Sequence, residues 1–260
     1  MTFGSITQQI DLPEVAVTVF FLLFAGLVWH LRRRDKLEGY PMQASPFDRT
    51  RLLGFPAPPP PEPYLLHEGG VTATPHFYPP TPIHARPLYP FDGTPLVPVG
   101  NPLLAAIGPG AWVNRRDEPM LTEKGKLMLQ PLRHLEDWRV EEGEADPRGM
   151  TVFDWRWAEV GVVRDIWVDE SIKILRLLEV ELRPGLGRDH VLVPVFHTDI
   201  REGAREVRVE SLRWHQFADV PMPATPDRIT AREDERLNAY YAAGRFYRDS
   251  PLVDPPGPQP

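Results

Sequence analysis

The feature that most constrains this chain is an apolar run near its N-terminus that leads directly into a cluster of arginines. From Val15 to Leu31 no residue carries a fixed charge, and Arg32 to Arg34 follow at once. A helix of roughly 20 residues crosses a hydrocarbon core of about 30 Å. The run reaches that length by including its flanks, so the sequence predicts one transmembrane helix at residues 12–33.

The charges beside this run predict its orientation. Cationic residues concentrate on the cytoplasmic side of a membrane span, and residues 1–11 contain no Lys or Arg. We therefore expect residues 1–11 on the periplasmic side and the bulk of the chain in the cytoplasm. The residues expected at the membrane interface are Trp29, Arg32, Arg33 and Arg34.

The apolar run and its arginines have other possible interpretations. A signal peptide carries its positive charge before the apolar run and a small-residue cleavage site after it, whereas here the order is reversed. A buried helix of a soluble protein and an arginine patch for nucleic acid remain alternatives. The net charge of −7 argues against nucleic-acid binding. His30, beside the arginines, is expected at the interface rather than as a pigment ligand.

A proline-rich segment follows the predicted helix, over residues 34–130. The chain contains 32 prolines, and the densest group lies between Gly54 and Pro63. Successive prolines lack amide donors and favour polyproline II. Aromatic and aliphatic residues are interspersed among them, which favours a chain that lies ordered across another protein's surface. A flexible tether is the alternative.

The pattern changes in residues 131–225. Residues 162–169 and 174–182 alternate between apolar and charged side chains, residues 191–196 are apolar, and residues 183–188 form a Gly- and Pro-containing turn. Short alternating runs separated by turns predict a small antiparallel sheet or barrel.

A helix and tail are expected over residues 226–260. Thr230 and Glu233 have the spacing of a capping box, in which each side chain bonds the other's backbone amide. Gly244 is predicted to end this helix.

Motifs for catalysis or cofactor binding are missing from the sequence. There is no cysteine, and no two of the eight histidines lie three or four residues apart, so no metal site is predicted. Nucleotide-binding loops and nucleophile elbows are also absent. We therefore expect no catalytic residues and a protein that is not an enzyme. The many charges of residues 115–148 are expected mostly at the surface, but any buried ones would be paired and could relay protons.

Several short stretches run in order from the predicted membrane helix to about Tyr247. They are Leu31–Arg33 with Glu38–Pro41, Gly100–Pro102 with Gly108–Trp112, Asp146–Gly149, Asp165–Asp169, Leu178–Glu181, Phe217–Pro221, and Glu233–Asp234 with Ala239–Ala242. Together, and at compatible spacing, they resemble the H subunit of purple-bacterial photosynthetic reaction centres.

The resemblance implies a fold and a role. The fold is a single N-terminal transmembrane helix, an extended surface segment, a mainly-β cytoplasmic domain of the PRC-barrel type and a short C-terminal helix. The role is that of a subunit without pigments in a bacterial photosynthetic membrane, which caps the cytoplasmic face of subunits L and M, stabilises the complex and assists proton delivery to the secondary quinone. Bacteriochlorophyll, bacteriopheophytin, quinones and non-haem iron would be bound by partner subunits. A cytochrome subunit, light-harvesting antenna and lipids are further candidate partners, and nucleic acid is not.

The resemblance also suggests proton-route candidates, with departures from the family. Where relatives often have an acidic residue after the Asp165–Asp169 motif, this chain has Ile172, and lysines replace two surface histidines. A lysine relays protons poorly near neutral pH. The alternative function is a single-pass anchor whose PRC-type barrel scaffolds another complex. A membrane-tethered enzyme is a third hypothesis. The candidates are Glu170, Asp169, Arg176, Glu123, Lys124 and Lys126.

Overall fold

The computed structural model describes residues 12–40, 42–43, 51–67, 69–75, 83–91 and 93–249 of the chain. The chain divides into two compact units, residues 1–82 and 83–260, and each is described by itself. The first unit contains α1 (Leu12–Arg34), β1 (Met42–Gln43), β2 (Arg51–Leu52), β3 (Glu62–Leu65) and β4 (Val71–Thr74). The second contains β5 (Ala85–Pro87), β6 (Leu96–Pro98), β7 (Leu129–Pro131), β8 (Thr151–Phe153), β9 (Glu159–Asp169), β10 (Ile174–Leu182), β11 (His190–Pro194), β12 (Thr198–Arg201), β13 (Glu206–Val209) and α2 (Ala231–Tyr247).

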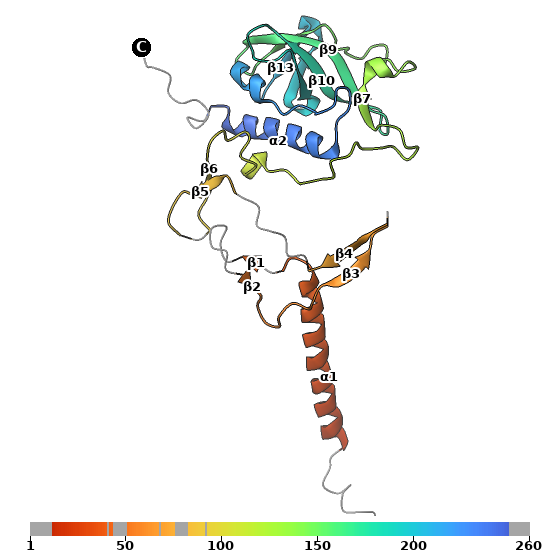
Figure 1. The fold of residues 1–260 in the computed structure, drawn as a ribbon, viewed down its shortest axis with the longest axis vertical. Coiled ribbons are helices and arrows are strands. Elements are labelled where there is room, and N and C mark those ends of the chain that lie inside the picture. Colours follow the sequence, from red (N-terminus) through yellow and green to blue (C-terminus); the bar gives the residue numbers. More distant parts are fainter. Residues whose placement is uncertain are drawn as a thin grey trace, which may run out of the picture. The chain divides into compact units, whose positions relative to one another are not determined.

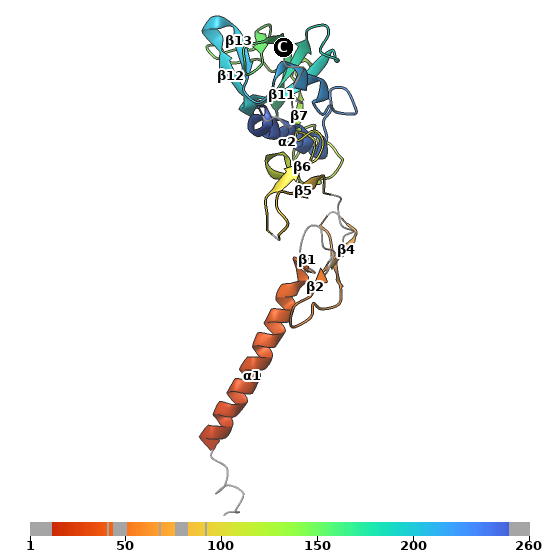
Figure 2. The same cartoon turned by 90° about the vertical axis from the view of Figure 1, so that its left-hand side faces the viewer.

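Helix α1 is apolar on every side, and none of its residues is buried. Figure 2 shows it as one continuous helix. Glu14 lies in its first turn and the arginines in its last, as the helix dipole favours. Leu12–Leu37 is a candidate membrane span with a hydropathy of 2.0. A helix that is apolar all round needs lipid or protein around it, so α1 is a candidate membrane-spanning helix.

The chain folds back against the end of α1 through Lys36, which is only 5% exposed. Its ammonium donates hydrogen bonds to the carbonyl oxygens of Leu53 at 2.9 Å and Pro56 at 2.5 Å. It also lies 4.9 Å from the centre of the Tyr40 ring. These bonds satisfy a buried charge and attach the proline-rich segment to the residues that follow α1.

The second unit is built on a seven-stranded sheet (Figure 1). The strand order is β11-β10-β9-β8-β13-β12, and β7 pairs with β9. All pairs are antiparallel except that of β13 with β8. Strands β9 and β10, which the alternation predicted, pair as a long hairpin and contribute fully buried side chains such as Val160, Leu178 and Val180 to the core. The expected fold class is confirmed: an apolar N-terminal helix, a mainly-β unit and a short C-terminal helix.

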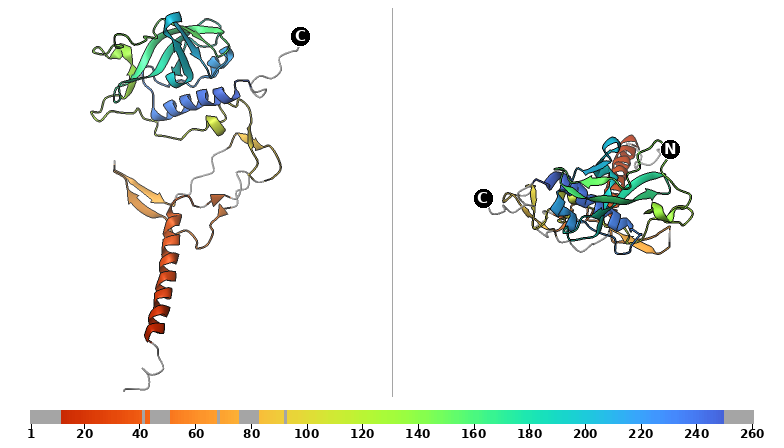
Figure 3. Two further views of the ribbon diagram at one scale, coloured as in Figure 1. Left: turned by 180° about the vertical axis from the view of Figure 1, so that it is seen from behind. Right: turned by 90° about the horizontal axis from the view of Figure 1, so that it is seen from above.

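Helix α2 lies against this sheet (Figure 3) and is held there by two tyrosines. The hydroxyl of Tyr241 donates to the Leu192 carbonyl at 2.9 Å, and that of Tyr240 to the Gln216 carbonyl at 2.8 Å. The predicted capping box between Thr230 and Glu233 is present.

The prediction that Gly244 ends α2 is wrong, because the helix continues to Tyr247. Gly244 lies inside the helix and packs against Ser211 and Leu212 of the second unit. A Cβ built there would lie 2.5 Å from Leu212 Cδ2 and 2.7 Å from the Ser211 carbonyl oxygen. The glycine is needed for close packing and not for chain reversal.

We therefore expect Gly244→Ala to destabilise the second unit by about 1–3 kcal/mol, the range for overpacking a core. Alanine in an unobstructed helix normally gains stability over glycine. The matched control is Gly26→Ala in α1, where a Cβ meets nothing within 4 Å. Denaturant unfolding of both variants in mild detergent checks this prediction. A stabilising Gly244→Ala would show that the helix does not pack this closely.

Candidate functional site

The turn between β9 and β10 carries the predicted proton-route residue Asp169. Its side chain is buried, at 5% exposure. One carboxylate oxygen accepts hydrogen bonds from the Ser171 amide at 2.9 Å, the Ser171 hydroxyl at 2.5 Å and the Ile172 amide at 3.3 Å. Asp169 thus shapes the turn with one oxygen and leaves the other for a cation.

That cation is Arg176, which a β-bulge places opposite Asp169. In the β9–β10 pairing, Leu175 lies across from Val168 and Leu177 from Trp167, so Arg176 is an extra residue. A bulge re-aims the side chain of such a residue. Its guanidinium lies 3.6 Å from the second oxygen of Asp169.

The same guanidinium lies 3.4 Å from a carboxylate oxygen of Asp234, in the first turn of α2. The Asn238 amide donates to the other Asp234 oxygen at 3.0 Å. Burial disfavours the charged carboxylate and raises the pKa of Asp234 above its ordinary value, although the Arg176 cation and Asn238 oppose this. Asp234 was not among the predicted candidates. The sequence signal that could have found Asp234 is its position in the first turn of a helix with a predicted capping box.

This pKa shift predicts a pH dependence of stability. The folded chain binds the Asp234 proton more tightly than the unfolded chain, so stability falls as pH rises from the ordinary pKa through the raised one. Asp234→Asn cannot ionise, so we expect it to gain stability relative to the wild type as pH rises through that window. Denaturant unfolding at a series of pH values measures the difference.

The matched control is Asp199→Asn, which removes a carboxylate that is 43% exposed on edge strand β12. If the free energy of unfolding of Asp234→Asn minus that of the wild type stays constant or decreases as pH rises, the inferred direction is wrong.

Glu170 follows Asp169 in the chain and is less buried, with a side chain that is 18% exposed. Lys126 Nζ lies 3.6 Å from one carboxylate oxygen. Gln130 Nε2 donates to the other at 3.2 Å. Glu123 and Lys124 are exposed on the same turn as Lys126, and neither pairs with another residue in the described ranges. The structure thus pairs Asp169 with Arg176, and Glu170 with Lys126.

Together these groups form what we call the turn cluster: Lys126, Asp169, Glu170, Arg176 and Asp234. It contains an exposed lysine, a partly exposed carboxylate and two buried carboxylates that share one guanidinium. Carboxylates are side-chain groups that exchange protons readily when they are in reach of each other or of bound water.

A second ionic group, which the sequence did not predict, surrounds Arg133. One of its nitrogens lies 2.7 Å from Asp165 and 2.7 Å from Glu179, both buried, and another contacts Asp227. His134 also contacts Asp227, at 3.1 Å. Burial lowers the pKa of Arg133, but its bonds to Glu179 and Asp165 outweigh this and leave the pKa above its ordinary value. Arg133 therefore stays charged and holds these carboxylates together.

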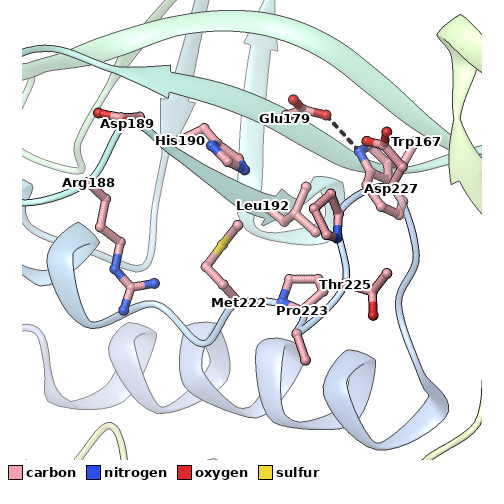
Figure 4. Close-up of a pocket in the computed structure, with 12 residues that line it drawn as sticks. Trp167, Glu179, Arg188, Asp189, His190, Leu192, Met222, Pro223, Thr225 and Asp227 are labelled. Atoms are coloured by element: carbon pink, nitrogen blue, oxygen red, sulfur yellow. Dashed lines mark hydrogen bonds between the residues drawn. The ribbon is translucent and has the colours of Figure 1, made fainter.

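The Arg133 group borders a cavity of about 370 Å³ (Figure 4). Figure 4 shows Met222 and Pro223 on one side of it, Leu192 across from them, and the Trp167 indole donating to Glu179, at 3.1 Å. Because Glu179 and Asp227 belong to both the ionic group and the cavity wall, the Arg133 contacts fix the shape of one wall. In the described part of the chain, no group of three or more His, Asp or Glu is arranged to hold a metal ion.

The predicted interface residues lie at the end of α1. Trp29 packs edge-on against Phe55, with ring centres 5.0 Å apart. Arg34 pairs with Glu62 at 2.6 Å. Arg32 lies 3.9 Å from Asp35, and Arg33 is exposed. Two of these side chains, Trp29 and Arg34, thus fasten the folded segment to the helix, and Arg32 and Arg33 are exposed.

Two protein families match different parts of the chain. The family described as photosynthetic reaction centre, H-chain N-terminal region, matches residues 4–134. The PRC-barrel domain family matches residues 140–213, which include strands β8 to β13. The first match covers half of the chain and includes helix α1 and strands β1 to β7. The chain therefore belongs to the family of photosynthetic reaction centre H subunits.

Proposed function

We propose that this chain covers the cytoplasmic face of the pigment-binding L and M subunits, stabilises their complex and assists proton delivery to the secondary quinone. Family membership implies association with a reaction centre. The observation that carries the finer proposal is the turn cluster, because a buried quinone that is reduced twice needs a polar path for protons. The pigments, quinones and non-haem iron would lie on the partner subunits.

The exposed helix α1 supports membrane anchoring. The division proposed from the sequence assigns residues 1–11 to the periplasm, 12–33 to the span, 34–130 to a surface segment, 131–225 to the barrel and 226–260 to the C-terminal helix and tail. The alternative, a generic PRC-barrel anchor for another complex, is less favoured because the H-chain family match extends over the region before the barrel.

The orientation can be tested with single cysteines, since the chain has none of its own. We expect Ser5→Cys to react with a membrane-impermeant maleimide added from the periplasmic side. We expect Glu202→Cys, an exposed position of the β unit, to react only after the membrane is opened. Labelling of Glu202→Cys in sealed cells together with protection of Ser5→Cys would reverse the proposed topology.

A further inference from the structure

A group of arginines surrounds two tryptophans in the turn between β8 and β9, on a part of the second unit that the turn cluster does not include. The guanidiniums of Arg201 and Arg208 lie 4.4 and 4.8 Å from the centre of the Trp157 ring. That of Arg248 lies 4.2 Å from the Trp155 ring. This concentration of positive charge is unexpected in a chain with a net charge of −7.

A hollow of about 200 Å³ lies within this group, lined by Trp155, Arg208, Glu210, Arg245 and Arg248. Three separate parts of the fold form it: the β8–β9 turn, the end of β13 and the last turns of α2. The three guanidiniums of the lining face the Glu210 carboxylate, and Asp249 lies 3.8 Å from Arg248 Nε. Three positive charges against these two carboxylates leave an excess of positive charge.

Hydrogen bonds with the protein fix two of these guanidiniums, and each keeps further N–H donors that the protein does not use. Arg208 donates to the Trp155 carbonyl oxygen from Nε at 3.2 Å and from Nη2 at 2.6 Å. Arg248 Nη1 donates to the Glu210 carbonyl oxygen. Arg208 Nη1 and Arg248 Nη2 have no acceptor among the described residues. Guanidiniums that are already oriented lose little conformational freedom when they bind an anion.

Of the three arginines, Arg245 makes the fewest polar interactions with the protein. Its side chain is 59% exposed, and in the described ranges its one ion pair is that of Nη2 with Glu210, at 3.3 Å. Nε and Nη1 remain available. The positive field of Arg245 also reaches the partly buried His197, whose pKa is lowered first by burial and then by this cation.

Part of this charge has a simpler explanation. Cations near the C-terminal end of a helix are stabilised by the helix dipole, which accounts for Arg245 and Arg248 on α2. It does not account for Arg208, which comes from β13 and points its guanidinium to the same hollow. Convergence of donors from separate elements is typical of a site for a multivalent anion.

We propose that this hollow binds an oxyanion of the phosphate class, either a free phosphate or the phosphate of an anionic lipid headgroup. A tetrahedral phosphate presents oxygens in several directions and suits three guanidiniums that approach from different elements. A polymeric nucleic acid is disfavoured because the chain is acidic overall.

The test uses the full chain in its isolated complex, held in an amphipathic polymer. Inorganic phosphate is titrated at constant ionic strength and followed by phosphorus NMR line broadening. Separately, the complex is sedimented with phosphatidylcholine vesicles that do or do not contain phosphatidylglycerol. We expect Arg245→Gln to weaken binding of the effective probe about tenfold, the effect of losing a charge-assisted hydrogen bond. The control Arg201→Gln removes the same charge outside the hollow and should change binding less than about twofold.

The two probes separate the sources of the anion. Saturable phosphate binding that Arg245→Gln weakens supports a free phosphate, and selective binding to phosphatidylglycerol vesicles with the same sensitivity supports a lipid headgroup. Arg245→Glu, with folding checked by circular dichroism, should abolish either one. Absence of saturable binding to both probes, or equal weakening by Arg245→Gln and Arg201→Gln, would overturn the proposal.

Discussion

Replacing Arg133 with methionine is expected to lower the free energy of unfolding of the second unit by about 3 kcal/mol, the lower end of the range for removing one partner from a buried ionic group. The lower end applies because the Arg133 side chain is 37% exposed, whereas those of Asp165 and Glu179 are 8% and 6% exposed. Methionine leaves the two buried carboxylates side by side without a cation. Denaturant unfolding in mild detergent, followed by tryptophan fluorescence, measures the loss.

The matched control is Arg148→Met. Arg148 makes an equally short ion pair with Asp146, at 2.6 Å, but the two side chains are 41% and 37% exposed. Exposed pairs contribute about 0–1 kcal/mol, so this change should be nearly neutral. Similar losses for both variants would mean that burial of Asp165 and Glu179 does not govern the energetics of the Arg133 group.

Replacing Asp169 with asparagine and Glu170 with glutamine together is expected to slow the proton uptake that accompanies the second electron by about tenfold or more, as loss of a positioned proton carrier does. Amides keep the shape of the carboxylates and can still accept the Ser171 hydrogen bonds that form the turn. The pigment content should therefore be unchanged. Flash-induced absorption changes in the isolated complex, with a pH-indicator dye, measure the uptake rate.

A charge-matched control is Asp199→Asn combined with Glu202→Gln, on edge strand β12 and the turn after it. These two positions are exposed or partly exposed and lie outside the turn cluster, so proton uptake should be unaffected. Unchanged flash kinetics in the Asp169 and Glu170 variant would remove both residues from the route. A loss of pigment in that variant would instead indicate a structural role.

Local patterns in the sequence predicted several elements well. The uncharged run predicted α1, alternation predicted strands β9 and β10, and residues 183–188 predicted the turn that follows β10. The capping box at Thr230 predicted the start of α2. Each of these signals acts over a few residues, so no knowledge of the tertiary structure is needed.

Other features depend on contacts between distant residues. Strands β7 and β8 are three residues long and too short to show a period. Arg133 meets Asp165 and Glu179 across 32 and 46 residues of sequence. The bulge that turns Arg176 toward Asp169 depends on strand register, and Gly244 is required by the approach of Leu212. Asp165 and Glu179 alternate with apolar residues, which alone would suggest exposure, yet other parts of the unit cover them.

The most direct test of the central claim is an absorption spectrum of the material that co-purifies with this chain from its native membrane in mild detergent. The proposed function predicts near-infrared bacteriochlorophyll bands that bleach reversibly on illumination, in a fixed ratio to the chain. A colourless preparation that retains other stable partners would contradict it and would favour a PRC-barrel anchor for a different complex.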